Sequence, residues 1–205
     1  TWHHPNMPWD GSELWTATIA PDGTLTEQRQ VAGGARESIF QPQWSPDGVL
    51  YFVSDRSGWW NLYRDNQSLY PMEAEFGVPQ WVFGLSTYAF LSATQIVSIY
   101  QRNGVSYLAV LDVTARTLHT VSTPFNYMTH LTVADGQVLM IVGSATMGMT
   151  IVRLNPTTGE HEVVRRASEL QLDEGYLSQA QAIEFPTDNG LTAHAFFYRP
   201  KNKDF

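Results

Sequence analysis

The sequence predicts an all-β protein that is built from repeated antiparallel units. The repeat shows first in four glycines, each of which precedes a similar apolar run, at spacings of roughly 44 to 47 residues: Gly11, Gly58, Gly104 and Gly148. A turn followed by an alternating apolar run is a second marker, and it keeps step with the first at Pro46-Asp47-Gly48, Ala93-Thr94 and Ala134-Asp135-Gly136. Two markers that share one period indicate a repeat architecture.

The second repeat shows what each unit contains. We expect strands over residues 40–44, 49–55 and 60–64 and a short outer strand over residues 68–71. The first two strands are joined by a turn with a physical cause, because Pro46 presets φ, Asp47 bonds its own backbone and Gly48 accepts a positive φ. Short strands separated so often by turns are typical of all-β proteins.

The other connections use the same turn chemistry, at Pro21-Asp22-Gly23, residues 155–159 and Asp188-Asn189-Gly190. The one helix candidate, residues 168–173, is too short to form a layer. Four-stranded antiparallel units at this period describe the blades of a β-propeller. We therefore predict a partial β-propeller of about four four-stranded blades. A β-sandwich also has many short strands, but it does not explain the paired markers.

Composition excludes several classes of function. The chain has 205 residues, of which 43% are hydrophobic, and its formal net charge is −8. Both lysines lie at the C-terminal end, Lys201 and Lys203, so no basic stripe can follow a phosphate backbone and no nucleic acid partner is expected. No apolar run approaches the ~20 residues that span a bilayer, so no membrane partner is expected. The absence of cysteine excludes thiolate chemistry but leaves the compartment open, with the cytoplasm favoured.

Several motifs resemble those of known propeller families. The segment Trp44-Ser45-Pro46-Asp47-Gly48, with Ser54-Asp55-Arg56 after it, resembles the repeat of Tol-type and peptidase propellers. Three further stretches resemble the acylaminoacyl-peptidase and dipeptidyl-aminopeptidase branch of the prolyl oligopeptidase family of serine peptidases: residues 2–11, Glu73-Ala74-Glu75-Phe76-Gly77-Val78-Pro79-Gln80-Trp81, and residues 183–187 with 190–195. The resemblance covers nearly the whole chain.

The resemblance implies a domain organisation. In that family a propeller precedes an α/β-hydrolase domain and filters substrates on their way to a Ser-Asp-His triad. Residues 1–178 are then propeller blades, and residues 179–205 are the first hairpin of a hydrolase domain that is missing from this chain. The family's Gly-x-Ser-x-Gly motif does not occur, since residues 84–88 lack its last glycine, so no catalytic residue is assigned. We expect the chain to be part of a longer polypeptide with more blades.

Glu73 and Glu75 are the candidate substrate-binding residues. Two carboxylates in one loop between blades can bind the α-ammonium group of a peptide, because a cation is held best by several anions in a partly desolvated cleft. Dipeptidyl peptidases use acidic propeller residues in this way, although the Glu-Ala-Glu spacing is not their motif. The alternative is a solvated acidic loop.

No metal site or cofactor is expected. His3 and His4 are adjacent on an extended segment and point to opposite faces. His194 has no nucleophile with it, and the other histidines have no partner at ligand spacing, namely His119, His130 and His161. Asp-Gly turns account for the three candidate calcium ligands, Asp10, Asp47 and Asp135. Most members of a set of seven aromatic residues are expected in the core, with one of Trp59 and Trp60 exposed. The set is Trp9, Trp15, Trp44, Trp59, Trp60, Trp81 and Phe83.

The main hypothesis from the sequence is a non-catalytic propeller segment of a serine exopeptidase that acts on peptides and gates their access to the catalytic domain. The hypothesis from another class is a stand-alone Tol-type propeller that binds a partner. The hairpin around residues 182–200 argues against it. An incomplete ring leaves apolar blade faces without a neighbour, so a homo-oligomer is also expected.

Overall fold

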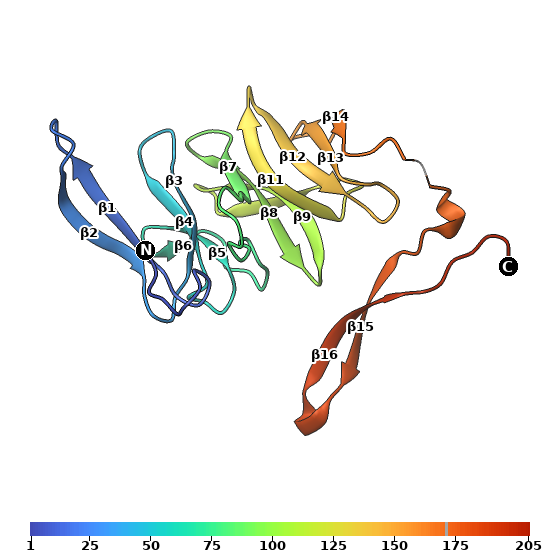
Figure 1. The fold of residues 1–205 in the computed structure, drawn as a ribbon. Helices are drawn as coiled ribbons and strands as arrows, with labels where there is room; N and C mark the ends of the chain where they lie inside the picture. The colour runs from blue at the N-terminus through green and yellow to red at the C-terminus, as the bar shows by residue number, and fades with distance from the viewer. Residues whose placement is uncertain (171) are drawn as a thin grey trace.

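The computed structural model describes residues 1–170 and 172–205. Within these residues, three four-stranded antiparallel sheets follow one another along the chain (Figure 1). The first contains β3 (Ile39–Trp44), β4 (Leu50–Ser54), β5 (Asn61–Arg64) and β6 (Gln67–Ser68). The second contains β7 (Tyr88–Phe90), β8 (Gln95–Arg102), β9 (Val105–Asp112) and β10 (Thr117–Val121). The third contains β11 (Tyr127–Ala134), β12 (Gln137–Gly143), β13 (Thr150–Leu154) and β14 (His161–Arg166).

A two-stranded sheet precedes these three and consists of β1 (Glu13–Ile19) and β2 (Leu25–Gly33). The four marker glycines stand before β1, β5, β9 and β13, so β1 and β2 correspond to the two outer strands of a unit. The predicted propeller architecture is confirmed. The expected four-stranded form holds for three of the four repeats, and the first has two strands in the described chain.

The core lies between neighbouring sheets, as expected for blades that pack face to face. One cluster joins the β1–β2 sheet to the β3–β6 blade and includes Leu14, Ala32, Ile39, Phe52 and Tyr63. A larger cluster joins the β3–β6 and β7–β10 blades, and its fully buried members include Phe40, Tyr51, Val53, Phe76, Tyr88 and Leu111. A third joins the β7–β10 and β11–β14 blades around Leu108, Leu131, Val138, Met140 and Val152. Burial of these apolar faces is the main stabilising contribution.

The inner strands of the blades are also joined by polar contacts. Gln41, at a bulge of β3 with φ of 46°, accepts a hydrogen bond from the backbone N–H of Thr87 over 2.8 Å. Its amide donates to the carbonyl of Tyr88 over 2.7 Å, and the Tyr88 hydroxyl donates back to the Gln41 carbonyl over 2.8 Å. Burial raises the pKa of Tyr88, so the phenol stays protonated as a donor. These bonds fix the position of β7 relative to β3.

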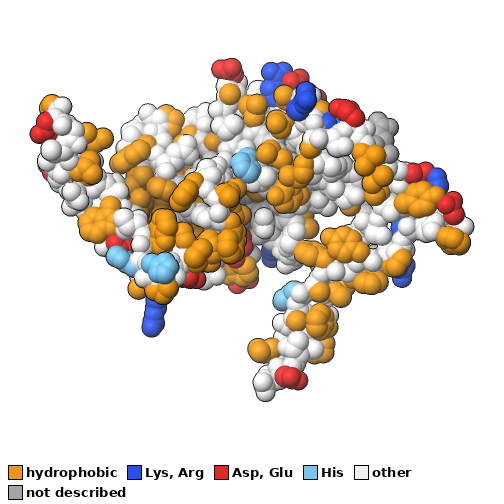
Figure 2. Space-filling model, in the orientation of Figure 1, with side chains coloured by type: hydrophobic (Ala, Val, Ile, Leu, Met, Phe, Trp, Pro, Cys, Tyr) orange, Lys and Arg blue, Asp and Glu red, His pale blue; other side chains and the backbone are white. Residues whose placement is uncertain are grey.

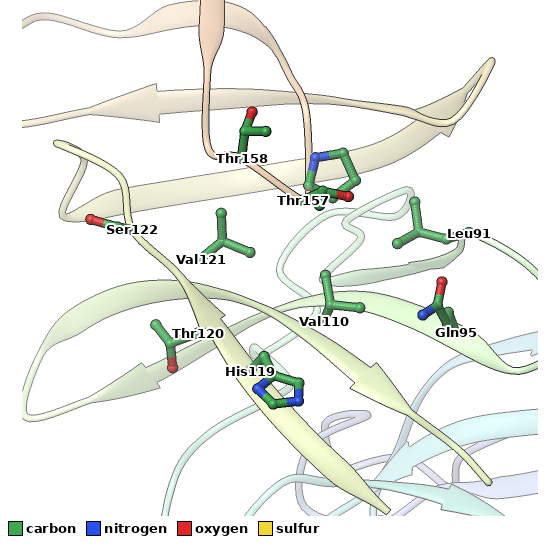
Figure 3. Close-up of a pocket in the computed structure, with 10 residues that line it drawn as sticks. Leu91, Gln95, Val110, His119, Thr120, Val121, Ser122, Thr157 and Thr158 are labelled. Atoms are coloured by element: carbon green, nitrogen blue, oxygen red, sulfur yellow. The ribbon is translucent and has the colours of Figure 1, made fainter. Parts of the chain in front are cut away.

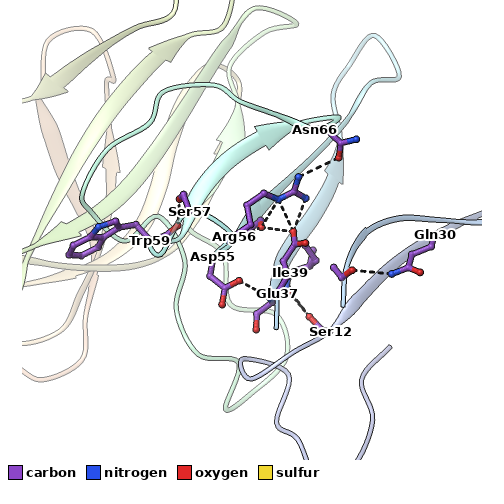
Figure 4. Close-up of polar contacts among 12 residues, drawn as sticks. Ser12, Gln30, Glu37, Ile39, Asp55, Arg56, Ser57, Trp59 and Asn66 are labelled. Atoms are coloured by element: carbon purple, nitrogen blue, oxygen red, sulfur yellow. Dashed lines mark hydrogen bonds and ion pairs between the residues drawn. The ribbon is translucent and has the colours of Figure 1, made fainter. Parts of the chain in front are cut away.

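A polar cluster holds the connection between β4 and β5 (Figure 4). The guanidinium of Arg56 contacts Glu37 over 2.7 and 2.8 Å and lies over the ring of Tyr63 at 4.7 Å. Asp55 accepts a hydrogen bond from the backbone N–H of Ser38 over 2.7 Å. Burial raises the pKa of Asp55, with a smaller contribution in the same direction from the charge of Glu37. The segment that precedes β3 is thereby tied to the β4–β5 turn.

The C-terminal hairpin stands apart from the blades (Figure 1). It consists of β15 (Ala180–Pro186) and β16 (Thr192–Tyr198), joined by the 3₁₀ turn Asp188–Gly190, as predicted from Asp188-Asn189-Gly190. The ring of Phe196 packs directly on Gly104, in the turn between β8 and β9, where a Cβ atom would lie 1.9 Å from the ring. The hairpin therefore lies at the end of the blade from which the β8–β9 turn projects.

The helix candidate over residues 168–173 is not observed as a helix in residues 168–170, and residue 171 lies outside the described residues. A short 3₁₀ turn follows instead at Glu174–Tyr176. No described helix combines the length and apolar character that crossing a membrane requires.

Candidate functional site

The long connection between β6 and β7 builds the candidate site. It is anchored at its start by Asn61, which is 2% exposed. The Asn61 side chain accepts from the backbone N–H of Met72 over 2.9 Å and donates to the Met72 carbonyl over 3.0 Å. Further along the connection, the amide of Gln80 donates to the carbonyl of Ile39 over 3.1 Å. Residues 73 to 79 are thus fixed at both ends.

Glu75 is positioned by two neighbouring strands. Its backbone pairs with that of Gln101 at the end of β8, through hydrogen bonds of 3.0 and 2.8 Å. Its Oε2 atom accepts from the backbone N–H of Trp60 over 2.9 Å. The Trp60 ring lies against Gly77, where even a methyl group would come within 2.4 Å of it. A glycine at position 77 is therefore needed for the Trp60 ring to lie where it does.

Glu75 lines a pocket of about 230 Å³ between the β7–β10 and β11–β14 blades. The walls come from the β6–β7 connection, from β8 and from β11, and they are mostly apolar: Val78, Pro79, Trp81, Leu85, Thr87, Ile99, Gln101, Tyr127, Met128 and Thr129. Among the described residues, no ion pair involves Glu75, and its second carboxylate oxygen accepts no hydrogen bond. A half-buried carboxylate in such surroundings favours binding of a cation.

Glu73 lies differently. Its side chain is exposed, does not line the pocket and takes part in no ion pair among the described residues. Ala74, between the two glutamates, is fully buried and separates their environments. The geometry thus distinguishes two residues that the sequence treats as a pair.

The aromatic residues correct one prediction. Most were expected in the core, but five are exposed by 39 to 80%: Trp15, Trp44, Trp59, Trp81 and Phe83. Trp81 packs on Trp9 with ring centroids 4.4 Å apart, and Phe83 lies 6.4 Å from Trp2. Trp59 is exposed and Trp60 is half-buried, as expected for adjacent residues on an extended segment.

The histidines do not gather into a site. His3 lies 3.5 Å from Glu13, and His194 lies 3.4 Å from Glu184 on the paired strand, with most of each histidine side chain exposed. In the part of the chain that the structure describes, no group of three metal-binding side chains is found. His119 lines a second hollow of about 460 Å³, where Thr157 and Thr158 lie across from the end of β10 (Figure 3). That hollow holds no carboxylate or basic side chain other than the imidazole.

The pocket walls were not found from the sequence, with the exception of Glu75. Trp81 stands in the stretch that carries the family resemblance, but its packing on Trp9 depends on contact between segments far apart in the chain. Gln101 and Tyr127 are ordinary strand residues in the sequence. Their place beside Glu75 follows from the docking of two blades, which has no local signal.

Comparison with known proteins identifies the family. No family model and no curated protein sequence matches the chain. Solved structures do match: puromycin hydrolase has a TM-score of 0.89 and 32% identity over 100% of the chain, and a puromycin-hydrolyzing peptidase from Mycobacterium tuberculosis has a TM-score of 0.92 and 33% identity over 99%. The chain is a propeller segment of the prolyl oligopeptidase family. Its parent family consists of serine peptidases.

This propeller segment spans 32% of the length of both puromycin-hydrolysing structures. Prolyl oligopeptidase B from Galerina marginata shares the fold over 93% of the segment, with a TM-score of 0.69 and 13% identity. The segment thus has the propeller fold of prolyl oligopeptidase B and, at 32–33% identity, matches the puromycin-hydrolysing structures in sequence as well.

Proposed function

We propose that the chain is the substrate-gating propeller part of a serine exopeptidase, of the acylaminoacyl-peptidase or dipeptidyl-aminopeptidase type. In this proposal Glu75 binds the free α-ammonium group of a peptide, and the catalytic Ser, Asp and His are supplied by a hydrolase domain elsewhere in the natural polypeptide. The observation that carries it is the half-buried Glu75 carboxylate, which has no ion-pair partner among the described residues and lines a mostly apolar pocket. The 205-residue chain alone is then catalytically inert.

The position of the hairpin supports this arrangement. Phe196 rests on Gly104, only three residues along the chain from Gln101, whose backbone pairs with Glu75. A hydrolase domain that contains the hairpin therefore lies on the side of the propeller where the Glu75 pocket is. A peptide whose amine is held by Glu75 would extend toward that domain.

The hairpin surface supports a larger partner domain. Hydrophobic side chains lie along its length (Figure 2), and six of them are 40 to 66% exposed: Ile183, Phe185, Leu191, Phe196, Phe197 and Tyr198. A two-stranded hairpin is at best marginally stable alone, so these side chains favour burial in a larger sheet. We assign residues 179–205 to the hydrolase domain and residues 1–178 to the propeller on this basis.

The outer faces of the first and last sheets, β1–β2 and β11–β14, form a second proposed contact surface. Trp15, Ile19 and Leu25 are exposed on the β1–β2 sheet. Ile151 is exposed on the β11–β14 blade, on the face opposite to Val152, which packs against the β7–β10 blade. In the interior, equivalent faces pack against a neighbouring blade. We propose that these faces pair with further blades of the natural polypeptide or, in the isolated chain, with another copy.

The test of the amine anchor uses the natural polypeptide and paired peptides with a free or an acetylated N-terminus. Puromycin is included as a substrate because the matching solved structures are puromycin-hydrolysing enzymes. Charge-assisted hydrogen bonds contribute about 1.5–3 kcal/mol. Glu75→Gln is therefore expected to lower kcat/KM for free-amine peptides about tenfold or more and to spare acetylated ones. Glu73→Gln is the matched variant, with a smaller expected effect because that side chain lies outside the pocket. Equal losses on free and acetylated peptides with Glu75→Gln would contradict the proposal.

A further inference from the structure

The pocket around Glu75 has a second feature, a wall formed by the indole of Trp81, which is tilted against the indole of Trp9. Trp81 lines the pocket and is itself 74% exposed, while its ring packs on Trp9 with centroids 4.4 Å apart. The backbone N–H of Trp81 donates to the carbonyl of Pro79 over 3.0 Å. Together these contacts hold an accessible aromatic face in the same pocket as the carboxylate.

We infer that Trp81 selects an aromatic side chain on the peptide residue whose amine is bound by Glu75. This inference rests on the proposed function and adds the class of substrate: peptides with a free N-terminus and an aromatic first residue. The carboxylate binds the ammonium group, and the indole wall binds the ring of the same residue.

The size of the pocket agrees with this occupant. An engineered apolar cavity of ~150 Å³ accommodates benzene. The Glu75 pocket measures about 230 Å³, which is enough for a phenyl ring together with its methylene group. Its other walls include Ile99 and Met128, which are 2 and 3% exposed and present an apolar surface.

The chemistry of the wall also favours an aromatic ring over an aliphatic chain. Aromatic pairs prefer offset or tilted arrangements and gain stabilisation beyond the apolar area that they bury. The face of an indole in addition attracts a nearby ammonium group. Trp81 thus interacts with both parts of an aromatic N-terminal residue, whereas glycine or alanine at that position would leave its face in water.

The test measures selectivity in the natural polypeptide. Two free-amine peptides that differ only in a first residue of phenylalanine or glycine are compared as substrates. Trp81→Ala is expected to lower the phenylalanine-to-glycine ratio of kcat/KM about tenfold or more, and Trp81→Phe to retain most of the ratio. Phe83→Ala is the matched control: Phe83 is an aromatic of the same loop, 80% exposed, that does not line the pocket. It is expected to leave the ratio unchanged.

A second measurement does not depend on turnover. Binding of phenylalaninamide and glycinamide to the same protein and its Trp81→Ala variant is followed by tryptophan fluorescence or calorimetry. Tighter binding of phenylalaninamide that is lost in Trp81→Ala supports the inference. An unchanged ratio in Trp81→Ala, or equal losses in Trp81→Ala and Phe83→Ala, would overturn it. Failure of the proposed amine binding by Glu75 is detected by a separate measurement, the effect of Glu75→Gln on kcat/KM for free-amine and acetylated peptides.

Discussion

Replacement of Gly77 by alanine tests how the Glu75 site is built. The added methyl group would lie 2.4 Å from Cε3 and 2.9 Å from Cδ2 of Trp60, and 3.2 Å from Cγ1 of Val53. Carbon atoms in contact are normally about 3.5–4.0 Å apart, so the indole must retreat by about 1 Å. Its edge-on packing with Phe40, at 6.0 Å between centroids, opposes this movement.

Overpacking of this kind costs about 1–3 kcal/mol. We expect Gly77→Ala to lower the free energy of unfolding by about 2 kcal/mol. The measurement is denaturant unfolding monitored by tryptophan fluorescence. The control is Gly148→Ala, since a Cβ atom at position 148 has nothing within 4 Å, and a change of at most about 0.5 kcal/mol is expected there.

A double variant separates steric strain from other causes. Trp60→Leu removes most of the ring that the added methyl group would contact, so the cost of Gly77→Ala should fall below about 1 kcal/mol in that background. The same cost in both backgrounds, or equal stability of the Gly77→Ala and Gly148→Ala proteins, would show that contact with Trp60 does not explain the glycine.

Three further predictions concern stability and assembly. Asn61→Leu leaves the Met72 N–H and carbonyl without their partner and should cost at least about 2 kcal/mol of unfolding free energy, whereas the exposed Asn66→Ala should cost little. Burial raises the pKa of Asp55, so above that pKa the ionised carboxylate lowers the free energy of unfolding. This loss disappears as the pH falls and the carboxyl group becomes protonated. Asp55→Asn should therefore gain stability relative to the natural chain at pH 7, and this gain should shrink toward pH 4 in acid unfolding curves; a gain that grows toward pH 4 would contradict the assignment. The isolated chain should self-associate, which light scattering measures. A stable monomer that binds no hydrophobic dye would contradict the proposed pairing through the exposed blade faces.

The architecture was predictable because its signals are local and repeated. Each turn carries its own cause, as at Gly48 with φ of 78°, and the strand expected over residues 60–64 is observed as β5, at Asn61–Arg64. The two carboxylates close together in one loop pointed to Glu73 and Glu75, and of these Glu75 lines a pocket. The family is therefore readable from one chain without an alignment.

What could not be predicted depends on contact between blades. Glu73 and Glu75 differ in environment because Ala74 between them is buried and because the Trp60 N–H binds Glu75 alone. The Glu-Ala-Glu pattern predicts neither feature. Exposed aromatic residues were expected in the core because large apolar side chains are usually buried there. Trp81 departs from this expectation because it is 74% exposed, and its contact with Trp9 joins segments far apart in the chain.

The contact between Phe196 and Gly104 has a consequence for related sequences. A methyl group at position 104 would overlap the ring, and the φ of 72° there also disfavours other residues. Any lineage that replaces this glycine must therefore shrink the side chain at position 196 or shift the hairpin. The two positions should covary across homologues, although they lie on opposite sides of the proposed domain boundary. The residue pairs found at these two sites in homologues would thus record how the orientation of the hairpin relative to the blades has diverged in evolution.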